Sequence, residues 1–195
     1  EVRVDGTCIR DVDPVGLRRS IGYVIQQAGL FPHRKVIDNI ATVPMLNGIA
    51  KAEAHRRANE LMELVGLETS MGQRYPDQLS GGQQQRVGVA RGLAADPNIL
   101  LMDEPFGAVD PLVRADLQAE LLRIQTELHK TIVFVTHDIA EALALGDQIV
   151  ILAKAARIGQ VGSPQEVVAN PADAFVAEFL GLGRGTLDLH LRETP

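Results

Sequence analysis

Short apolar runs alternate with longer amphipathic segments along most of the chain. The apolar runs of strand length occupy residues 20–26, 99–103 and 132–135. The segments with apolar residues at helical spacing occupy residues 52–65, 80–94 and 110–130. Strands that alternate with helices predict an α/β domain with a largely parallel sheet.

Both ends of the chain carry weaker patterns. Residues 1–4 alternate like a strand, and Asp5 with Gly6 is typical of a tight turn. Since these residues already resemble the interior of a fold, we expect the sequence to be incomplete at its N-terminus. The C-terminal part predicts a hairpin whose strands occupy residues 149–152 and 157–161. A short helix is expected to begin at residue 163, and a second one to occupy residues 172–180.

Polar residues mark where the helices begin. Ser80 with Gln83, and Asp138 with Glu141, have the spacing of a capping box. Asp110 precedes a proline, which is typical of an N-cap followed by the first helical position. The simplest interpretation of each pattern is a well-started helix.

The composition narrows the class of protein. Of the 195 residues, 46% are hydrophobic, which is enough for a substantial core. The net charge of −6 argues against a protein that binds nucleic acid through a basic surface. The single cysteine, Cys8, excludes an internal disulfide and favours a reducing, cytoplasmic compartment. Because no apolar run approaches the ~20 residues that span a bilayer, we expect no direct membrane insertion.

Polar side chains stand where the predicted strands end. Gln26 closes the first strand, Asp103 and Glu104 close the second, and His137 follows the third. Ligands of open α/β sheets bind outside the carboxyl ends of the strands. We therefore expect these side chains to meet in one crevice. The simpler alternatives are a glutamine that merely ends a strand and a histidine that merely starts a helix.

Two glycines open the helix at 80–94. Glycine in a helix costs about 1 kcal/mol relative to alanine, so Gly81 and Gly82 favour close approach of a ligand to the backbone. Free N–H groups and the helix dipole would then hold a phosphate. Ser80 and Gln83 join them as candidate nucleotide-binding residues, and the alternative is a helix that is only well capped.

Asp103 and Glu104 have the chemistry of phosphoryl transfer. Burying charge is expensive, so unpaired acids rarely end an apolar run for structural reasons alone; the alternative is a solvated strand end. Both acids are expected on the strand, with side chains on opposite sides and separate roles. Asp103 suits Mg²⁺, which prefers carboxylate and water oxygens. Glu104 suits the group that polarises an attacking water.

The printed sequence contains no P-loop, the G-x-x-x-x-G-K-[ST] segment that cradles phosphates. Of its lysines only Lys130 precedes a Ser or Thr, and His129 stands where that motif requires glycine.

In order and spacing these residues resemble the ATPase subunits of ABC transporters. Residues 79–83 are similar to the signature motif, and 99–104 to the Walker B strand with its catalytic acid. Gln26 resembles the Q-loop glutamine, residues 108–110 the D-loop, and His137 the switch histidine. The stretch 21–33, with 39–41 and 43–44, looks more narrowly like importers of glycine betaine, choline and carnitine.

The resemblance implies a fold and a division of the chain. The fold would be a P-loop NTPase-like α/β sheet with helices on both faces, a helical subdomain that carries the signature, and missing N-terminal core elements. The chain would be a single incomplete ABC ATPase domain. Its expected parts are a helical subdomain at 30–97, a catalytic core at 1–29 with 98–162, and C-terminal helices and tail at 163–195.

The resemblance also implies cofactors, partners and roles. ATP with Mg²⁺ would lie between the P-loop of one subunit and the signature of a second, in a head-to-tail homodimer. Glu104, His137 and Gln26 would be catalytic, Asp103 and Gln26 would hold Mg²⁺, and Asp110 would act across the interface. Gln26 and the segment after it would sense transmembrane permease subunits, which places the protein at the inner face of the cell membrane.

Three residues depart from the family pattern besides the missing P-loop. Gly92 stands where alanine is usual, at a cost of roughly 1 kcal/mol. Ala156 replaces a hairpin glycine, and Ala140 a common acidic residue. These departures concern stability more than identity.

The function that follows is ATP hydrolysis coupled to import of an osmoprotectant through a separate permease. One alternative is a soluble ABC ATPase that acts on nucleic acid or ribosomes, which the acidic balance disfavours. Another is a truncated, non-catalytic ABC domain that offers only a signature surface, which the missing P-loop favours.

Overall fold

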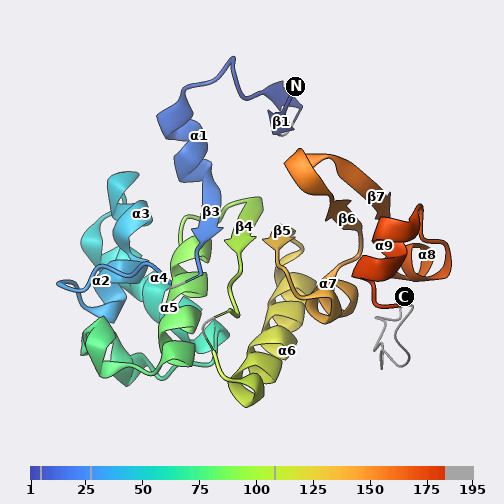
Figure 1. Ribbon diagram of the computed structural model, residues 1–195. Coiled ribbons are helices and arrows are strands. Elements are labelled where there is room, and N and C mark those ends of the chain that lie inside the picture. The colour runs from blue at the N-terminus through green and yellow to red at the C-terminus, as the bar shows by residue number, and fades with distance from the viewer. Residues whose placement is uncertain (5, 27, 108, 183–195) are drawn as a thin grey trace. The chain divides into compact units, whose positions relative to one another are not determined.

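The computed structural model describes residues 1–4, 6–26, 28–107 and 109–182 (Figure 1). The chain forms two compact units, Glu1–Val135 and Thr136–Pro195. The last part of the predicted C-terminal tail lies outside the described residues. The proposed division into a catalytic core and a helical subdomain remains a prediction.

A parallel sheet with strand order β3-β4-β5 organises the first unit. Its strands are β3 (Ile21–Val24), β4 (Ile99–Asp103) and β5 (Thr131–Val135), which confirms the three predicted strands. Leu101 pairs with Tyr23 on one side and Val133 on the other, so these residues form one row across the sheet. The carboxyl ends of the strands therefore share one edge.

One face of this sheet is closely packed against helix α5 (Gly81–Leu93) (Figure 1). Val24, Leu100 and Met102 on this face are buried. A Cβ at Gly22 would lie 2.4 Å from the carbonyl oxygen of Gly92, and a Cβ at Gly92 would lie 2.9 Å from Leu100 Cδ1. The two glycines let helix and strand approach each other, and this close packing offsets the helix-propensity cost expected for Gly92.

The opposite face of the sheet is apolar but exposed. Tyr23 is 51% exposed, Val133 49% and Val135 53%. Parallel sheets normally have both faces covered, and their strands are apolar on both sides for that reason.

Small helices surround α5 in the region expected to be helical. The longest is α4 (Lys51–Leu64), which confirms the helix predicted at 52–65 and packs against α5. The others are α2 (Val36–Ile40), α3 (Thr42–Leu46) and the 3-10 helices η1 (Thr69–Gln73) and η2 (Pro76–Gln78). Ile40 and Met62 are among the fully buried residues of this layer.

The remaining elements of the first unit lie at its N-terminus and after β4. Strands β1 (Arg3–Val4) and β2 (Thr7–Cys8) pair antiparallel, and helix α1 (Pro14–Ser20) precedes β3. Helix α6 (Pro111–Leu128) begins after Asp110 as predicted. It ends where His129 adopts a left-handed backbone with φ 50°, slightly before the expected end.

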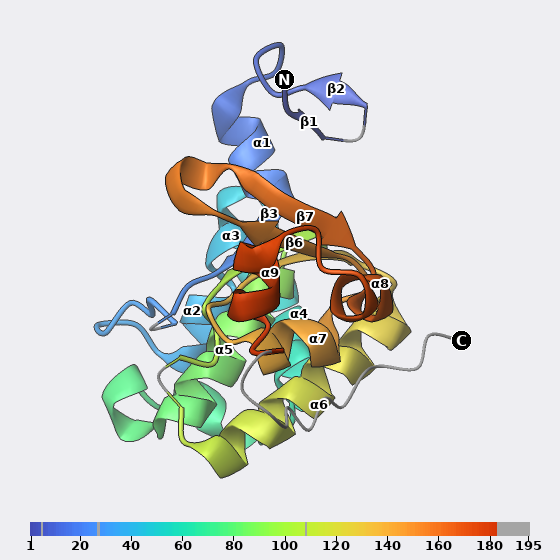
Figure 2. The ribbon, with the colours of Figure 1, turned by 45° about the vertical axis from the view of Figure 1, so that its right-hand side comes forward.

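The second unit consists of a hairpin with short helices (Figure 2). Strands β6 (Ile149–Leu152) and β7 (Ile158–Gly162) pair antiparallel around η3 (Lys154–Ala156), as the sequence predicts. The helices are α7 (Ile139–Leu145), α8 (Pro164–Ala169) and α9 (Ala174–Phe179). Their shared core contains Leu143, Ile149, Ile151, Val167, Val176 and Leu180.

The expected capping box at the start of α7 is only half formed. Asp138 Oδ1 accepts hydrogen bonds from the N–H groups of Ala140 (2.9 Å) and Glu141 (3.3 Å). The carboxylate of Glu141 instead accepts a bond from the hydroxyl of Thr136 (2.8 Å), and the N–H of Asp138 donates to that same hydroxyl oxygen (3.0 Å). The hydroxyl of Thr136 therefore lies between the N–H of Asp138 and the carboxylate of Glu141, which would bond each other directly in a complete capping box.

Candidate functional site

Gln26 and Glu104 meet at the carboxyl edge of the parallel sheet. Gln26 follows β3 and Glu104 follows β4, and the Nε2 group of Gln26 donates a hydrogen bond to Glu104 Oε2 at 3.0 Å. The two residues are 78 positions apart in the sequence. The neighbouring ends of parallel strands thus bring together these two predicted site residues.

Glu104 has an unusual backbone for a residue with a side chain. Its φ is 42°, in the left-handed region, and β4 ends one residue earlier at Asp103. The expectation that both acids lie on the strand is therefore wrong for Glu104. Its N–H donates to the carbonyl oxygen of Val135 (2.9 Å), and its own carbonyl accepts from the N–H of Gly107 (3.1 Å). These two bonds hold the turn in place.

Gly107 leaves the space that the amide of Gln26 occupies. A Cβ at Gly107 would lie 3.1 Å from Gln26 Nε2. The sequence gives no signal for this role, because the close approach exists only after β3 and β4 have paired.

Asp103 is exposed at the last position of β4, where it is aligned with Val135 of β5. Among the residues that the structure describes, no group of three or more His, Cys, Asp or Glu side chains could hold a metal. An exposed carboxylate nevertheless has the chemistry of the oxygen ligands that Mg²⁺ prefers, among which it keeps several waters.

The N-terminus of α5 is capped as the sequence predicts. Ser80 Oγ accepts from the N–H of Gln83 (3.3 Å), and Gln83 Oε1 accepts from the N–H of Ser80 (3.0 Å). Gly82 is buried, and a Cβ there would lie 2.5 Å from Val113 Cγ1 on α6. The glycine at position 82 is thus explained by its packing against α6. Gly81 is exposed at the start of the helix.

Asp110 and His137 occupy helix-start positions. Asp110 is the N-cap of α6, and its Oδ1 accepts from the N–H of Val113 at 3.1 Å. Ala108, in the predicted D-loop, lies outside the described residues. His137 is exposed in the second unit, between Thr136 and the N-cap of α7. The expected meeting of the strand ends is therefore confirmed for Gln26 and Glu104 and stays a prediction for His137.

Arg91 holds the segment that follows Gln26, a role that we did not predict from the sequence. Its Nη1 group donates to the carbonyl oxygen of Gly29 (2.7 Å), and its Nη2 group donates to that of Ala28 (2.6 Å). Burial lowers the pKa of the Arg91 guanidinium from its ordinary value. An arginine near the C-terminal end of a helix is usually explained by the favourable interaction of its charge with the helix dipole. Its position alone therefore does not indicate this contact.

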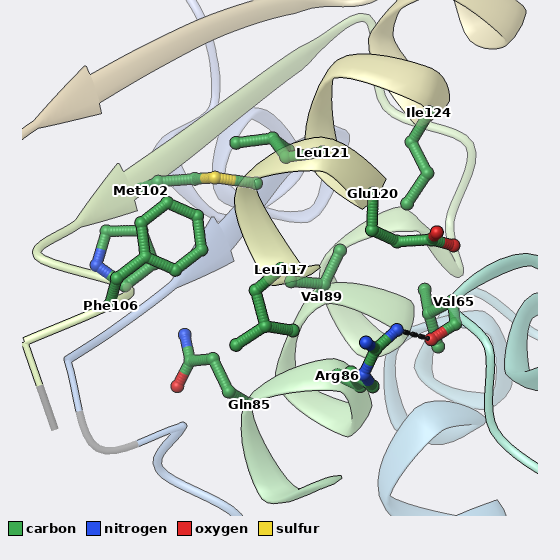
Figure 3. A pocket seen from close by; sticks show the side chains of 11 residues that line it. Val65, Gln85, Arg86, Val89, Met102, Phe106, Leu117, Glu120, Leu121 and Ile124 are labelled. Atoms are coloured by element: carbon green, nitrogen blue, oxygen red, sulfur yellow. Dashed lines mark hydrogen bonds between the residues drawn. The ribbon is translucent and has the colours of Figure 1, made fainter. Parts of the chain in front are cut away.

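A small cavity lies between α5, α6 and the end of β4 (Figure 3). Its volume is about 20 Å³, close to that of one water molecule. Most of its lining is apolar, as with Val89, Met102 and Leu117. Gln85 also lines it, and within the described part of the chain its buried Nε2 group has no hydrogen-bond partner. This cavity is far smaller than a nucleotide site, so the candidate site is the edge of the sheet.

Comparison with known proteins identifies the class. The profile of a family described as "ABC transporter" matches residues 1–107. The chain belongs to this family. The solved dimer of the ATP-binding cassette MJ0796, in a post-hydrolysis state with ADP and Pi, has the same fold. It superposes with a TM-score of 0.71 at 32% identity, covering 83% of this chain and 72% of that one.

Several similar proteins are ATP-binding proteins of transport systems. The choline transport ATP-binding protein OpuBA of Bacillus subtilis (strain 168) is 55% identical over 184 residues, which cover 94% of this chain and 48% of that protein. The glycine betaine uptake system ATP-binding protein YehX of Escherichia coli (strain K12) is 53% identical, covering 93% and 58% respectively. The chain thus spans about half the length of these relatives.

Proposed function

We propose that this chain belongs to the ATP-hydrolysing subunit of an importer for osmoprotectants of the choline, glycine betaine and carnitine class. The observation that carries the proposal is the hydrogen bond between Gln26 and Glu104 at the sheet edge. In this bond the amide of Gln26, after β3, contacts the carboxylate of Glu104, which corresponds to the catalytic acid in the family pattern. The similarity to choline and glycine betaine transport proteins supports the class of solute.

Glu104 is the proposed general base. Its carboxylate would accept the proton of the water that attacks the terminal phosphate of ATP. The bond from Gln26 holds one oxygen of this carboxylate in place. Asp103 and the amide oxygen of Gln26 would hold Mg²⁺, which neutralises charge on the phosphate oxygens when bound. His137 would contact the transferred phosphate.

The N-terminus of α5 is the proposed contact to a nucleotide held by a second subunit. Of its first-turn N–H groups, that of Gln83 donates to Ser80 Oγ, whereas those of Gly81 and Gly82 point along the helix axis toward a potential anion. Ser80 and Gln83 cap this terminus. Gly81 is exposed and keeps the backbone accessible there, and the N–H of Gly82 would contact the nucleotide beside it although Gly82 packs against α6. Asp110 would act across the same interface. The dimeric MJ0796 structure supports a pair of subunits, and the family pattern implies that they pair head to tail.

The proposed partners follow from the transport role. Two ATPase subunits would bind transmembrane permease subunits at the cytoplasmic face of the membrane. No helix in the described part of the chain is long and apolar enough to cross a bilayer.

The first test is the substitution Glu104→Gln in the full-length protein. It keeps the size of the side chain and removes the base, so we expect the ATPase rate to fall by about 10²–10⁴-fold while ATP binding persists. Steady-state hydrolysis and calorimetric binding measure the two effects. Glu178→Gln, at an exposed position on α9, is the control and should keep the wild-type rate. Retained turnover in Glu104→Gln would remove Glu104 from this role.

A further inference from the structure

We propose that Arg91 is a positioning residue that couples helix α5 to Gln26, and this inference rests on the proposed ATPase function. The guanidinium of Arg91 binds two consecutive carbonyl oxygens, those of Ala28 and Gly29, at 2.6 and 2.7 Å. These residues follow Gln26 closely in the chain. The contact therefore holds Ala28 and Gly29 in the stretch of chain that follows β3.

The clamped segment has a backbone that needs external support. Ala28 and Gly29 both adopt left-handed conformations, with φ of 55° and 52°. For alanine this conformation costs roughly 1–2 kcal/mol. Charge-assisted hydrogen bonds from a partly buried guanidinium are strong enough to offset such a cost. Without Arg91 the turn loses two of the bonds that keep it in this shape.

A second contact joins the same segment to α5. Ala28 is buried, and a Cβ at Gly88 would lie 3.2 Å from the Cβ of Ala28. Gly88 and Arg91 are three residues apart on α5 and therefore lie on one face of the helix. The segment is thus packed against the helix at one turn and hydrogen-bonded to it at the next.

The consequence is a mechanical link along a single helix. The N-terminus of α5 carries the proposed nucleotide contacts around Ser80, and its later part holds the segment of Gln26. Gln26 in turn binds Glu104 at 3.0 Å. A displacement of α5 would carry Ala28 with it and change how Gln26 meets the catalytic carboxylate. Arg91 would thus make the position of the base depend on the position of the signature helix.

Arg86 provides a matched control on the same helix. Its Nη1 group donates to the carbonyl oxygen of Val65 at 2.7 Å, at the end of α4. Arg86→Ala also removes a guanidinium–carbonyl contact of α5, but at the end of α4 instead of next to Gln26. A general loss of helix anchoring would affect both variants, whereas the proposed coupling is specific to Arg91.

The experiment compares Arg91→Ala, Arg91→Lys and Arg86→Ala in the full-length protein by hydrogen exchange and ATPase kinetics. In Arg91→Ala we expect the amide of Ala28, which donates to Ile25, to exchange about tenfold faster. We also expect kcat to fall about tenfold with little change in KM, because the loss affects the arrangement of the base. Arg91→Lys keeps the charge but lacks the planar fork of the guanidinium. Its exchange rate at Ala28 and its kcat should therefore lie between those of the wild type and Arg91→Ala. Arg86→Ala should accelerate exchange only near Val65 and keep kcat.

The outcomes separate this inference from the proposed function. Unchanged exchange at Ala28 in Arg91→Ala, or faster exchange with unchanged kcat, would overturn the coupling. An equal fall of kcat in Arg86→Ala would show that Arg91 contributes only to the general stability of α5. If Arg91→Ala does not fold, the exchange and kcat of Arg91→Lys decide. A wild-type protein without ATPase activity would refute the proposed function, and with it the catalytic half of this inference, while the exchange data would still decide whether Arg91 holds the segment.

Discussion

Several residues with side chains adopt a left-handed backbone, and they fall at positions of different kinds. Glu104 lies in the candidate site, Ala28 in the clamped segment, and Ala155 and Ala156 in the turn of the β6–β7 hairpin. Each conformation costs roughly 1–2 kcal/mol in a non-glycine residue. At Glu104 the side chain has a proposed function, whereas the hairpin alanines have none that the structure shows.

Replacement of Ala156 by glycine is expected to stabilise the second unit. The φ of Ala156 is 56°, and glycine adopts this value without steric cost. We expect the free energy of unfolding to rise by about 1 kcal/mol, measured by urea denaturation. Ala119→Gly, at an exposed position inside α6, is the control. Because glycine is unfavourable inside a helix, its free energy of unfolding should fall by about 1 kcal/mol. A loss of stability in Ala156→Gly would show that this turn is not strained.

Gly107→Ala is expected to impair catalysis more than folding. The new methyl group would lie 3.1 Å from the amide nitrogen of Gln26. The flexible end of Gln26 can move away, so we expect a change in unfolding free energy within about 0.5 kcal/mol. The displaced amide weakens its bond to Glu104, and we expect an approximately tenfold lower ATPase rate. A wild-type rate would mean that the Gln26–Glu104 bond contributes little.

The candidate site could be predicted from the sequence only where a residue stands at the end of an element. Gln26 and Glu104 follow apolar strands, so their meeting was predictable from the geometry of parallel sheets. Gly107 and Arg91 act through contacts with segments distant in sequence, and no local pattern marks them. The left-handed turn at Glu104 was also missed, because an apolar run that ends in acids indicates only an extended strand.

At the level of elements, the long helices, the strands of the parallel sheet and the short helices α7, α8 and α9 were predictable, whereas the short helices α1, α2 and α3 were not. Helices α4, α5 and α6 have enough turns for a periodic apolar face to be visible. Helices α1, α2 and α3 have 7, 5 and 5 residues. Tertiary contacts stabilise them instead, as with buried Asn39, whose side chain accepts from the N–H of Phe31 and donates to the carbonyls of Phe31, Arg34 and Lys35.

The packing of α5 against the sheet predicts the effect of Gly92→Ala. Helix propensity alone favours alanine by about 1 kcal/mol. The added methyl would lie 2.9 Å from Leu100 Cδ1 and 3.2 Å from Val24 Cγ2, in the packed face of the sheet. We expect overpacking to prevail, with a net destabilisation of about 1–3 kcal/mol in thermal or urea unfolding. A more stable variant would mean that Leu100 can move aside freely.

For the molecule as a whole, the exposed apolar face of the first unit has consequences in solution. Tyr23, Val133 and Val135 lie on this face, and each is about half exposed. Exposed apolar patches of this kind promote association. We expect the 195-residue chain to self-associate, and the double substitution Val133→Thr with Val135→Thr to reduce the associated fraction while preserving the strand. Sedimentation velocity measures both, and a monomeric wild-type chain would contradict the expectation.

The pairing of β3 with β4 also sets the order in which the molecule can fold. Strands β4 and β5 are joined through α6 alone, so they meet by closing a short stretch of chain. The contact between Gln26 and Glu104 joins residues 78 positions apart, across the whole helical layer. Distant pairings pay more loop-closure entropy and form slowly. We expect β3 to join the sheet late in folding, so that the contact proposed to serve catalysis is among the last to form.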